Sequence, residues 1–172
     1  QFGPICAQPT LPSGLARGSE DCLSINVWTP DGKTDGKRPV MVWIYGGAFV
    51  VGSSKSMLDQ GKTELSKRGV VLVSFNYRVG RLGACARPGR ARRHAGERVA
   101  IYWLMDQIAA LKWVKANIAA FGGDPDNVTI FGVSAGGTGV NALVASPAAR
   151  GLCHKAISQS GGGLFNSSTS LP

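Results

Sequence analysis

The stretch Val128-Thr129-Ile130-Phe131-Gly132-Val133-Ser134-Ala135-Gly136-Gly137 decides the fold of this 172-residue chain. Its β-branched and aromatic start predicts a strand, and residues 135–144 predict a helix. The G-x-S-x-G spacing puts glycines where the strand and helix backbones pass closely, and it holds the serine on a sharp turn facing the helix N-terminus. Ser134 is therefore the predicted nucleophile. Taken alone, the pentapeptide also fits a Gly/Ser-rich turn without chemistry.

Alternating strands and helices surround this stretch. Alternating apolar and polar residues predict a strand over 23–28, continuous apolar runs predict strands over 40–45 and 70–75, and another short strand is predicted over 156–160. The Asp-Pro-Asp of residues 124–126 predicts a turn into the strand before Ser134. A short helix is predicted over residues 60–68, and a longer one over 104–119, where apolar residues recur every three or four positions. This order predicts an α/β fold with a mostly parallel sheet flanked by helices.

A second turn is expected at the same edge of the sheet as Ser134. Ligands of parallel sheets bind at the carboxyl ends of the strands, and Gly46-Gly47-Ala48 directly follows the strand over residues 40–45. Backbone N–H groups without bulky side chains can stabilise the oxyanion of an acyl-transfer reaction. The predicted donors are the N–H groups of Gly47, Ala48 and Ala135; the alternative for the first two is an ordinary glycine-containing loop.

Composition and charge narrow the class of protein. With 44% hydrophobic and 17% charged residues, the chain is globular, and no apolar run approaches the ~20 residues of a membrane span. The net charge is +9, but residues 84–99 hold five arginines against one glutamate and so carry +4 of it. Because no other basic stripe with interleaved aromatic residues exists, we expect no nucleic-acid partner.

The four cysteines lack the C-x-x-C spacing of a zinc or thioredoxin-like site. Cys6 and Cys22 flank a Pro/Gly/Ser-rich loop and could close it as a disulfide, or both could be free thiols in a reducing cytosol. A bridge would favour a secreted or periplasmic protein, and free thiols a cytoplasmic one.

Six motifs in chain order resemble the type-B carboxylesterase, cholinesterase and lipase family of α/β-hydrolases. They are residues 19–28, 41–49, 75–80, 119–125, the stretch around Ser134, and 156–161. The resemblance implies hydrolysis of small-molecule carboxylic esters through a Ser-Glu-His triad, without metal or cofactor. It also puts Cys6 and Cys22 at the positions of the family's first disulfide.

The resemblance covers only part of a family domain. Family members run to several hundred residues, with the triad acid and histidine well downstream of the serine. We therefore expect residues 1–172 to be a partial domain with little or no activity of its own, with uncovered sheet edges, and with further chain before Gln1. Of the two histidines, His154 precedes the strand over 156–160, at the opposite end of the sheet from Ser134. His94 lies in a stretch that the pattern does not place, so neither is the predicted base.

Two local departures from the family pattern remain. Val133 stands where the family usually has a glutamate, which removes a carboxylate beside the nucleophile. Residues 84–99 are Arg-rich where the family has an apolar segment, and residues 100–103 replace a glycine-containing turn. Either a compensated reading-frame shift or a basic docking loop would explain this block.

Two other functions compete with ester hydrolysis. Some relatives in this family serve in adhesion after losing the nucleophile, so a non-catalytic binding protein is the main alternative. The retained Ser134 and its intact turn argue against that alternative. A nucleic-acid binder is suggested by the charge alone.

Overall fold

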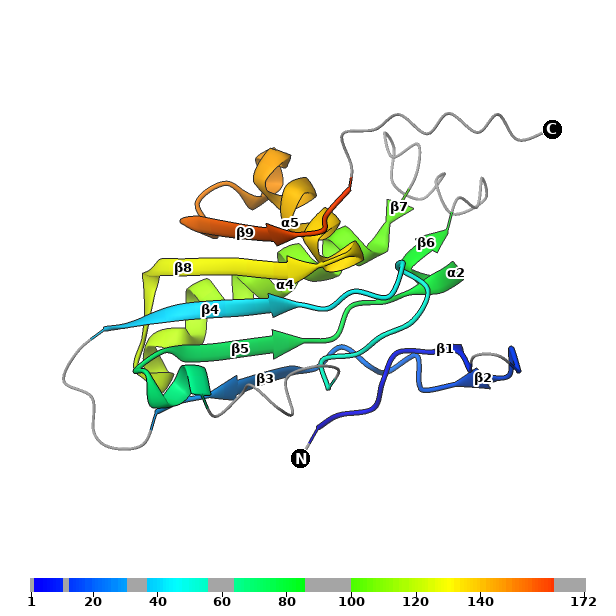
Figure 1. Ribbon diagram of the computed structural model, residues 1–172, viewed down its shortest axis with the longest axis horizontal. Helices are drawn as coiled ribbons and strands as arrows, with labels where there is room; N and C mark the ends of the chain where they lie inside the picture. The colour runs from blue at the N-terminus through cyan, green and yellow to red at the C-terminus, as the bar shows by residue number, and fades with distance from the viewer. Residues whose placement is uncertain (1, 11–12, 31–36, 56–63, 86–99, 163–172) are drawn as a thin grey trace.

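A five-stranded sheet, in the order β3-β5-β4-β8-β9, forms the centre of the computed structural model (Figure 1). The structure describes residues 2–10, 13–30, 37–55, 64–85 and 100–162. The strands are β3 (Ile25–Trp28), β4 (Arg38–Ile44), β5 (Val71–Phe75), β8 (Gly123–Val133) and β9 (Lys155–Gln159). Only the β3–β5 pair in this sheet is antiparallel. The prediction of a mostly parallel sheet is confirmed.

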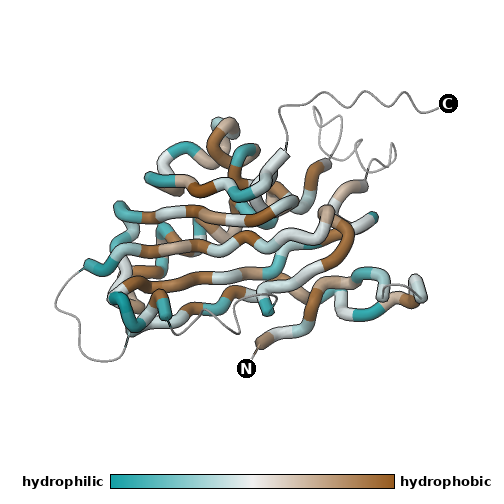
Figure 2. The backbone as a smooth tube through the Cα atoms, viewed as in Figure 1, coloured by the Kyte–Doolittle hydropathy of each residue, from teal (hydrophilic) through white to brown (hydrophobic). Residues whose placement is uncertain are grey.

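The middle strands of the sheet form the core. All five residues of β5 are buried, and the apolar side chains of β4 and β8 pack beside them. Figure 2 shows hydrophobic residues recurring along these strands. Strands covered on both faces read as continuous apolar runs rather than as alternating ones. That is why residues 40–45 and 70–75 could be identified as buried strands from their sequence.

Helices α4 (Tyr102–Asn117) and α5 (Ala135–Ala145) cover the same face of the sheet, behind it in Figure 1. Leu111, Val114 and Ile118 are fully buried, which confirms the periodicity of the predicted helix. A 3₁₀ turn, η1 (Ile118–Phe121), continues α4, and Gly122 then ends it with a left-handed φ of 77°. None of the helices in the described part of the chain is long and apolar enough to cross a membrane.

The turn predicted at residues 124–126 does not precede the strand but lies within it, because β8 already starts at Gly123. Asp126 N–H does bond to the Asp124 carboxylate at 2.9 Å, as in a local turn. However, Gly123 pairs with Arg38 of β4, and the Arg38 N–H donates to Gly122 O at 3.0 Å. Pairing with β4 then resumes only at Val40 and Val128, so residues 124–127 form an irregular segment inside β8 that keeps its local turn bond.

Short paired segments lie outside the main sheet. β1 (Gln8–Pro9) pairs with β2 (Ala16–Arg17), and β6 (Ala84–Cys85) pairs with β7 (Ala100–Ile101). This second pair joins the first two residues of the Arg-rich block to the two residues that follow it. Residues 86–99 of the block, His94 included, lie outside the described residues. Of the helix predicted over residues 60–68, residues 64–67 are helical and 60–63 lie outside the described part. Two further short helical elements are α2 (Gly80–Gly83), which precedes β6, and the 3₁₀ turn η2 (Pro147–Ala149), which follows α5.

Candidate active site

Ser134 lies on the turn between β8 and α5, with its side chain exposed. Its backbone has φ 56° and ψ −123°, a conformation that costs a non-glycine residue about 1–3 kcal/mol. Two backbone hydrogen bonds hold it there: Ser134 N–H donates to Gln159 O at 2.8 Å, and Thr138 N–H donates to Ser134 O at 2.9 Å. The sharp strand-to-helix turn predicted from the sequence is present.

The two glycines that flank Ser134 are required by close backbone approaches. A Cβ added to Gly132 would lie 2.6 Å from the Gly136 carbonyl carbon and 2.7 Å from Ile44 O. A Cβ on Gly136 would overlap Ile44 O and lie 2.7 Å from Tyr45 O. The end of β4 therefore presses directly against the first turn of α5.

The second turn, residues 46–49, lies beside Ser134. A Cβ added to Gly46 would lie 3.3 Å from the Ser134 Cβ, so the two turns are in contact. Gly47, Ala48 and Phe49 all have positive φ, at 114°, 55° and 58°. Two backbone N–H groups, of Val50 and Val51, donate to Gly47 O at 2.9 and 3.0 Å and close the turn.

Packing holds this unusual turn in place. The Phe49 ring stacks on Trp103 at the start of α4, with a centroid separation of 4.3 Å. Gly80 N–H donates to Phe49 O at 2.6 Å. No hydrogen bond joins the N–H groups of Gly47 and Ala48 to any other residue that the structure describes. The predicted donors Gly47, Ala48 and Ala135 thus lie at the same sheet edge as Ser134.

His154 directly precedes β9, at the end of that strand opposite to Ser134, as predicted. Its ring Nδ1 accepts the Val128 backbone N–H at 3.1 Å, and the His154 backbone N–H donates to Val128 O at 2.8 Å. Six residues of extended strand, about 20 Å, separate Val128 from Ser134. Within the described ranges, no histidine or carboxylate bonds the Ser134 hydroxyl, and no group of three or more His, Cys, Asp or Glu side chains could hold a metal ion.

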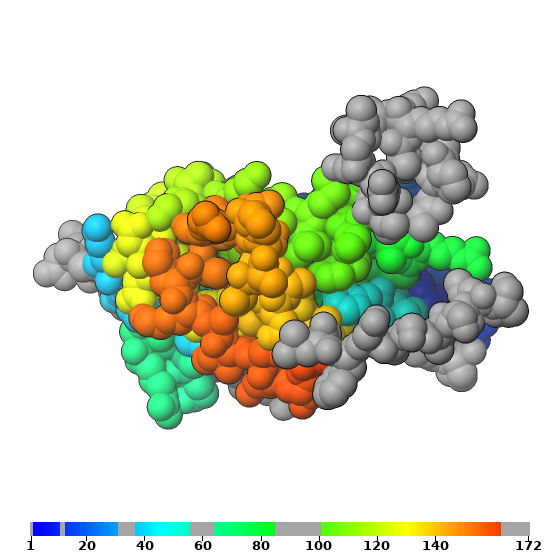
Figure 3. Space-filling view, turned by 90° about the horizontal axis from the view of Figure 1, so that it is seen from above, coloured from blue at the N-terminus to red at the C-terminus, as the bar shows by residue number. Residues whose placement is uncertain are grey.

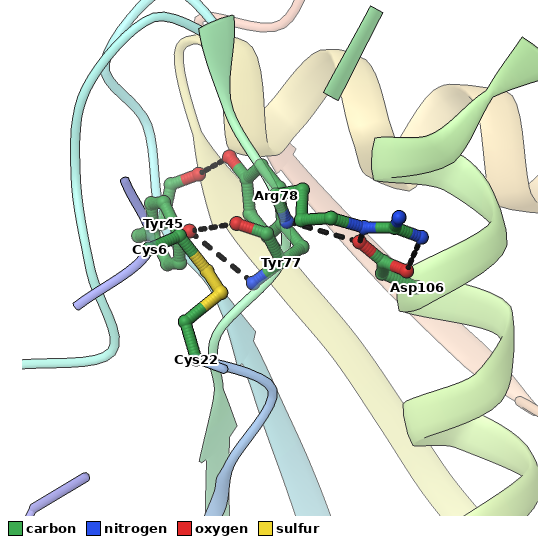
Figure 4. Close-up of polar contacts among 6 residues, drawn as sticks. All are labelled: Cys6, Cys22, Tyr45, Tyr77, Arg78 and Asp106. Atoms are coloured by element: carbon green, nitrogen blue, oxygen red, sulfur yellow. Dashed lines mark hydrogen bonds and ion pairs between the residues drawn. A yellow bond between two sulfur atoms is a disulfide. The ribbon is translucent and has the colours of Figure 1, made fainter. Parts of the chain in front are cut away.

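Behind the second turn lies a pair of tyrosines that the sequence analysis missed (Figure 4). The Tyr45 and Tyr77 rings stack at a centroid distance of 4.1 Å, and each hydroxyl donates to the other residue's carbonyl oxygen at 2.6 Å. Burial raises the pKa of both phenols, so both hydroxyls remain donors. The available signal was positional, because each tyrosine is the first or second residue after a buried strand.

An ion pair fixes the residue after Tyr77. Asp106 of α4 accepts the Arg78 backbone N–H at 3.0 Å and two guanidinium N–H groups at 2.8 and 2.7 Å. The hydrogen bond to Asp106 raises the pKa of Arg78, against the opposing effect of burial. The chain leaving β5 is therefore anchored to α4.

The disulfide joins Cys6 and Cys22, and both are buried beneath the same edge of the sheet (Figure 4). The Asn76 side chain donates to Pro4 O at 2.9 Å and to Cys22 O at 3.0 Å. These bonds fasten the bridged N-terminal segment to the chain leaving β5. Cys153 is a free thiol, and burial raises its pKa.

Comparison with known proteins identifies the family. The sequence profile of the carboxylesterase family matches residues 1–171. Bile salt-activated lipase from Bos taurus is 45% identical to this chain, in a match that covers 95% of this chain and 28% of the lipase. Para-nitrobenzyl esterase from Bacillus subtilis (strain 168) is 47% identical, in a match that covers 93% of this chain and 33% of the esterase. A solved structure titled PNB esterase matches with a TM-score of 0.79 and 48% identity, over 94% of this chain and 32% of that chain.

These relatives extend well beyond the matched region, because the chain spans about a third of their length or less. The match nevertheless includes both turns and the whole central sheet described above. The chain therefore belongs to the carboxylesterase family and has the fold of an α/β-hydrolase.

Proposed function

We propose that the protein is a serine hydrolase of carboxylic esters and that Ser134 is its nucleophile. One observation carries the proposal: an exposed serine is held in a strained backbone conformation between a strand and a helix, in contact with a second strained turn. Strain of this kind persists only where the surroundings enforce it, and it concentrates at active sites. Membership of the carboxylesterase family supports the same assignment.

The proposed reaction has two steps. The Ser134 Oγ attacks the ester carbonyl carbon while its proton passes to a general base, and the carbonyl oxygen becomes an oxyanion. The N–H groups of Gly47, Ala48 and Ala135 stabilise that oxyanion, and removal of one such donor costs about 3 kcal/mol in the transition state. The intermediate expels the alcohol, which takes up the proton, and leaves an acyl-serine. Water then cleaves the acyl-serine and releases the acid.

The general base is proposed to come from outside these 172 residues. His154 is too far from Ser134 to serve, since it precedes β9 and bonds Val128, six residues before Ser134 along β8. The relatives are about three times as long as this chain, and the family resemblance implies a triad histidine and acid downstream of the serine. We therefore infer that residues 1–172 are one part of a larger hydrolase domain. By themselves they retain at most the ~10³–10⁴-fold acceleration over water that the oxyanion hole and substrate binding provide.

The proposed substrate is a small-molecule carboxylic ester, and the reaction as written uses no metal or organic cofactor. The proposed location is outside the reducing cytosol, in a secreted or periplasmic protein. The buried Cys6–Cys22 disulfide supports this location, because such bridges persist in oxidising compartments.

The test is covalent labelling of Ser134 by a fluorophosphonate, read by intact-protein and peptide mass spectrometry. We expect a single adduct on Ser134 in the protein and none in Ser134→Ala. Ser146→Ala is the matched control, because Ser146 follows the other end of α5 and its loss should leave labelling unchanged. A folded, full-length protein without an adduct would contradict the proposal and favour the non-catalytic binding role.

A further inference from the structure

The carbonyl oxygen of Tyr45 is one of the backbone groups at which the two active-site turns meet. This oxygen lies against the first turn of α5, where a Cβ on Gly136 would come within 2.7 Å of it. Tyr45 also directly precedes Gly46 and Gly47. The plane of the Tyr45–Gly46 peptide therefore sets the direction in which the chain enters the turn that carries the proposed oxyanion donors.

A single side chain satisfies this carbonyl within the described residues. The Tyr77 hydroxyl donates to Tyr45 O at 2.6 Å, and both tyrosines are essentially inaccessible to solvent. A buried carbonyl that loses its partner bears an uncompensated desolvation cost of about 1–3 kcal/mol. The peptide would then be driven to rotate toward another donor, and the first turn of α5 lies against this oxygen.

The two hydrogen-bonded ends of the tyrosine pair have different neighbours (Figure 4). At one end, the Tyr77 hydroxyl holds the backbone that leads into residues 46–49. At the other end, the Tyr45 hydroxyl donates to Tyr77 O at 2.6 Å and accepts the Tyr77 N–H at 3.2 Å. That second end lies next to Arg78, whose backbone N–H is already held by Asp106. Only the first end acts on the chain entering the oxyanion turn.

We propose that Tyr77 is a positioning residue for the reaction: its hydroxyl holds the Tyr45–Gly46 peptide and so places the Gly47 and Ala48 N–H groups relative to Ser134. This inference rests on the proposed function. Tyr77 touches neither substrate nor Ser134, and it acts through the backbone of Tyr45. Displacement of the donors weakens stabilisation of the transition state more than binding of the ground state.

The asymmetry of the pair supplies a matched control. Tyr77→Phe removes the hydroxyl that donates to the Tyr45 carbonyl. Tyr45→Phe removes the other hydroxyl, which bonds the carbonyl and the N–H of Tyr77, and it leaves the Tyr45 carbonyl bonded. Both variants keep the stacked rings. A merely structural role therefore predicts that Tyr45→Phe is at least as damaging as Tyr77→Phe, and the positioning role predicts the opposite for the reaction.

The experiment measures fluorophosphonate labelling rates and the hydrolysis of a p-nitrophenyl ester on the full-length protein, with thermal unfolding recorded for each variant. Tyr77→Phe should lower the labelling rate constant and kcat about tenfold, with KM unchanged. This loss is smaller than the 10²–10³-fold loss in kcat on removing one oxyanion donor, because the donors are displaced rather than lost. Tyr45→Phe should change both rates less than about threefold. Replacing Tyr77 by 4-aminophenylalanine, which retains a donor, should recover most of the rate and also serves if Tyr77→Phe does not fold.

Equal rates in the two phenylalanine variants, or a rate loss that follows only their loss of stability, would overturn the inference while leaving the proposed function in place. Absence of any Ser134 adduct in the unmodified protein would overturn both. The two failures are therefore distinguished by the behaviour of the protein without substitution.

Discussion

Two regions of the molecule differ in how tightly they are packed. The carboxyl edge of β4 and β8 is crowded, whereas the outer edge of β9 is open to solvent. At the carboxyl edge, Ala48, Phe49 and Ser134 all have positive φ, and backbones approach so closely that only glycine fits at positions 132 and 136. Residues around β9 lie at the surface in the view of Figure 3. Every residue of this strand is exposed, and Ile157 keeps 44% of its surface accessible. Yet β9 is a regular strand, in unbroken register with β8.

The difference shows where this chain concentrates its contacts. Strained backbone survives only under dense packing, so the aromatic stacks, the tyrosine pair and the disulfide all lie near the two turns. An edge strand with exposed apolar side chains contributes little to the core and is a site of association with other chains. Substitutions in these two regions should therefore have very different effects.

The largest effect is expected from filling the contact between the two turns. Gly136→Ala places a methyl group against Ile44 O and Tyr45 O. We expect it to destabilise the fold by about 3 kcal/mol, or to prevent folding, because rigid backbone cannot yield to an added group. Denaturant unfolding measures this cost.

The control for that prediction is Gly139→Ala, three residues further along α5. There the added Cβ would meet the amide end of the Gln107 side chain at 2.8 Å, which can move, and the gain in helix propensity of about 1 kcal/mol offsets the crowding. Equal destabilisation by the two substitutions would contradict the special tightness of the contact at Gly136.

A smaller loss is expected when the disulfide is removed. The double variant Cys6→Ala/Cys22→Ala frees a loop with a sequence separation of 16, which should lower the free energy of unfolding by about 2–3 kcal/mol. Because Asn76 holds Cys22 O, the loss should also loosen the chain that leaves β5. Chemical denaturation measures this loss of free energy, with Cys153→Ala as the control. An equal loss in the double variant and in Cys153→Ala would contradict the prediction.

High pH should weaken the tyrosine pair. Burial raises the pKa of Tyr45 and Tyr77 above the value of 10.0 that applies in the unfolded chain. The free energy of unfolding is therefore unaffected by these groups below pH 10 and falls as the pH rises above it, by about 1.4 kcal/mol per pH unit for each group. Thermal unfolding between pH 9 and pH 11 should show a steeper decline than in the Tyr45→Phe/Tyr77→Phe double variant. Parallel declines in the two proteins would contradict this prediction.

The smallest effect on stability is expected at β9. Ile157→Lys adds a charge to an exposed edge strand and should change the free energy of unfolding by no more than about 0.5 kcal/mol. It should, however, reduce the self-association of the 172-residue chain, measured by sedimentation velocity. If the substitution destabilised the protein as strongly as Gly136→Ala, the contrast between the two regions would fail.

The sequence was sufficient where local pattern and backbone sterics decide the outcome. Continuous apolar runs identified β4 and β5, three- and four-residue spacing identified α4, and the G-x-S-x-G spacing located the strained turn at Ser134. Because strand ends follow from strand positions, the sequence also placed residues 46–48 near Ser134 and His154 far from it.

Only the tertiary structure decided the features that depend on distant partners. Residues 124–126 lie inside β8 because Gly123 before them and Val128 after them pair with β4, although their local sequence favours a turn. Asp106 and Gln107 are buried on α4 among apolar neighbours, and the Asp106 carboxylate finds its partner 28 residues away in Arg78. The bonds between Tyr45 and Tyr77 span 32 residues. Their sequence positions hold no periodic signal, since such contacts form only when separate strands and helices pack together.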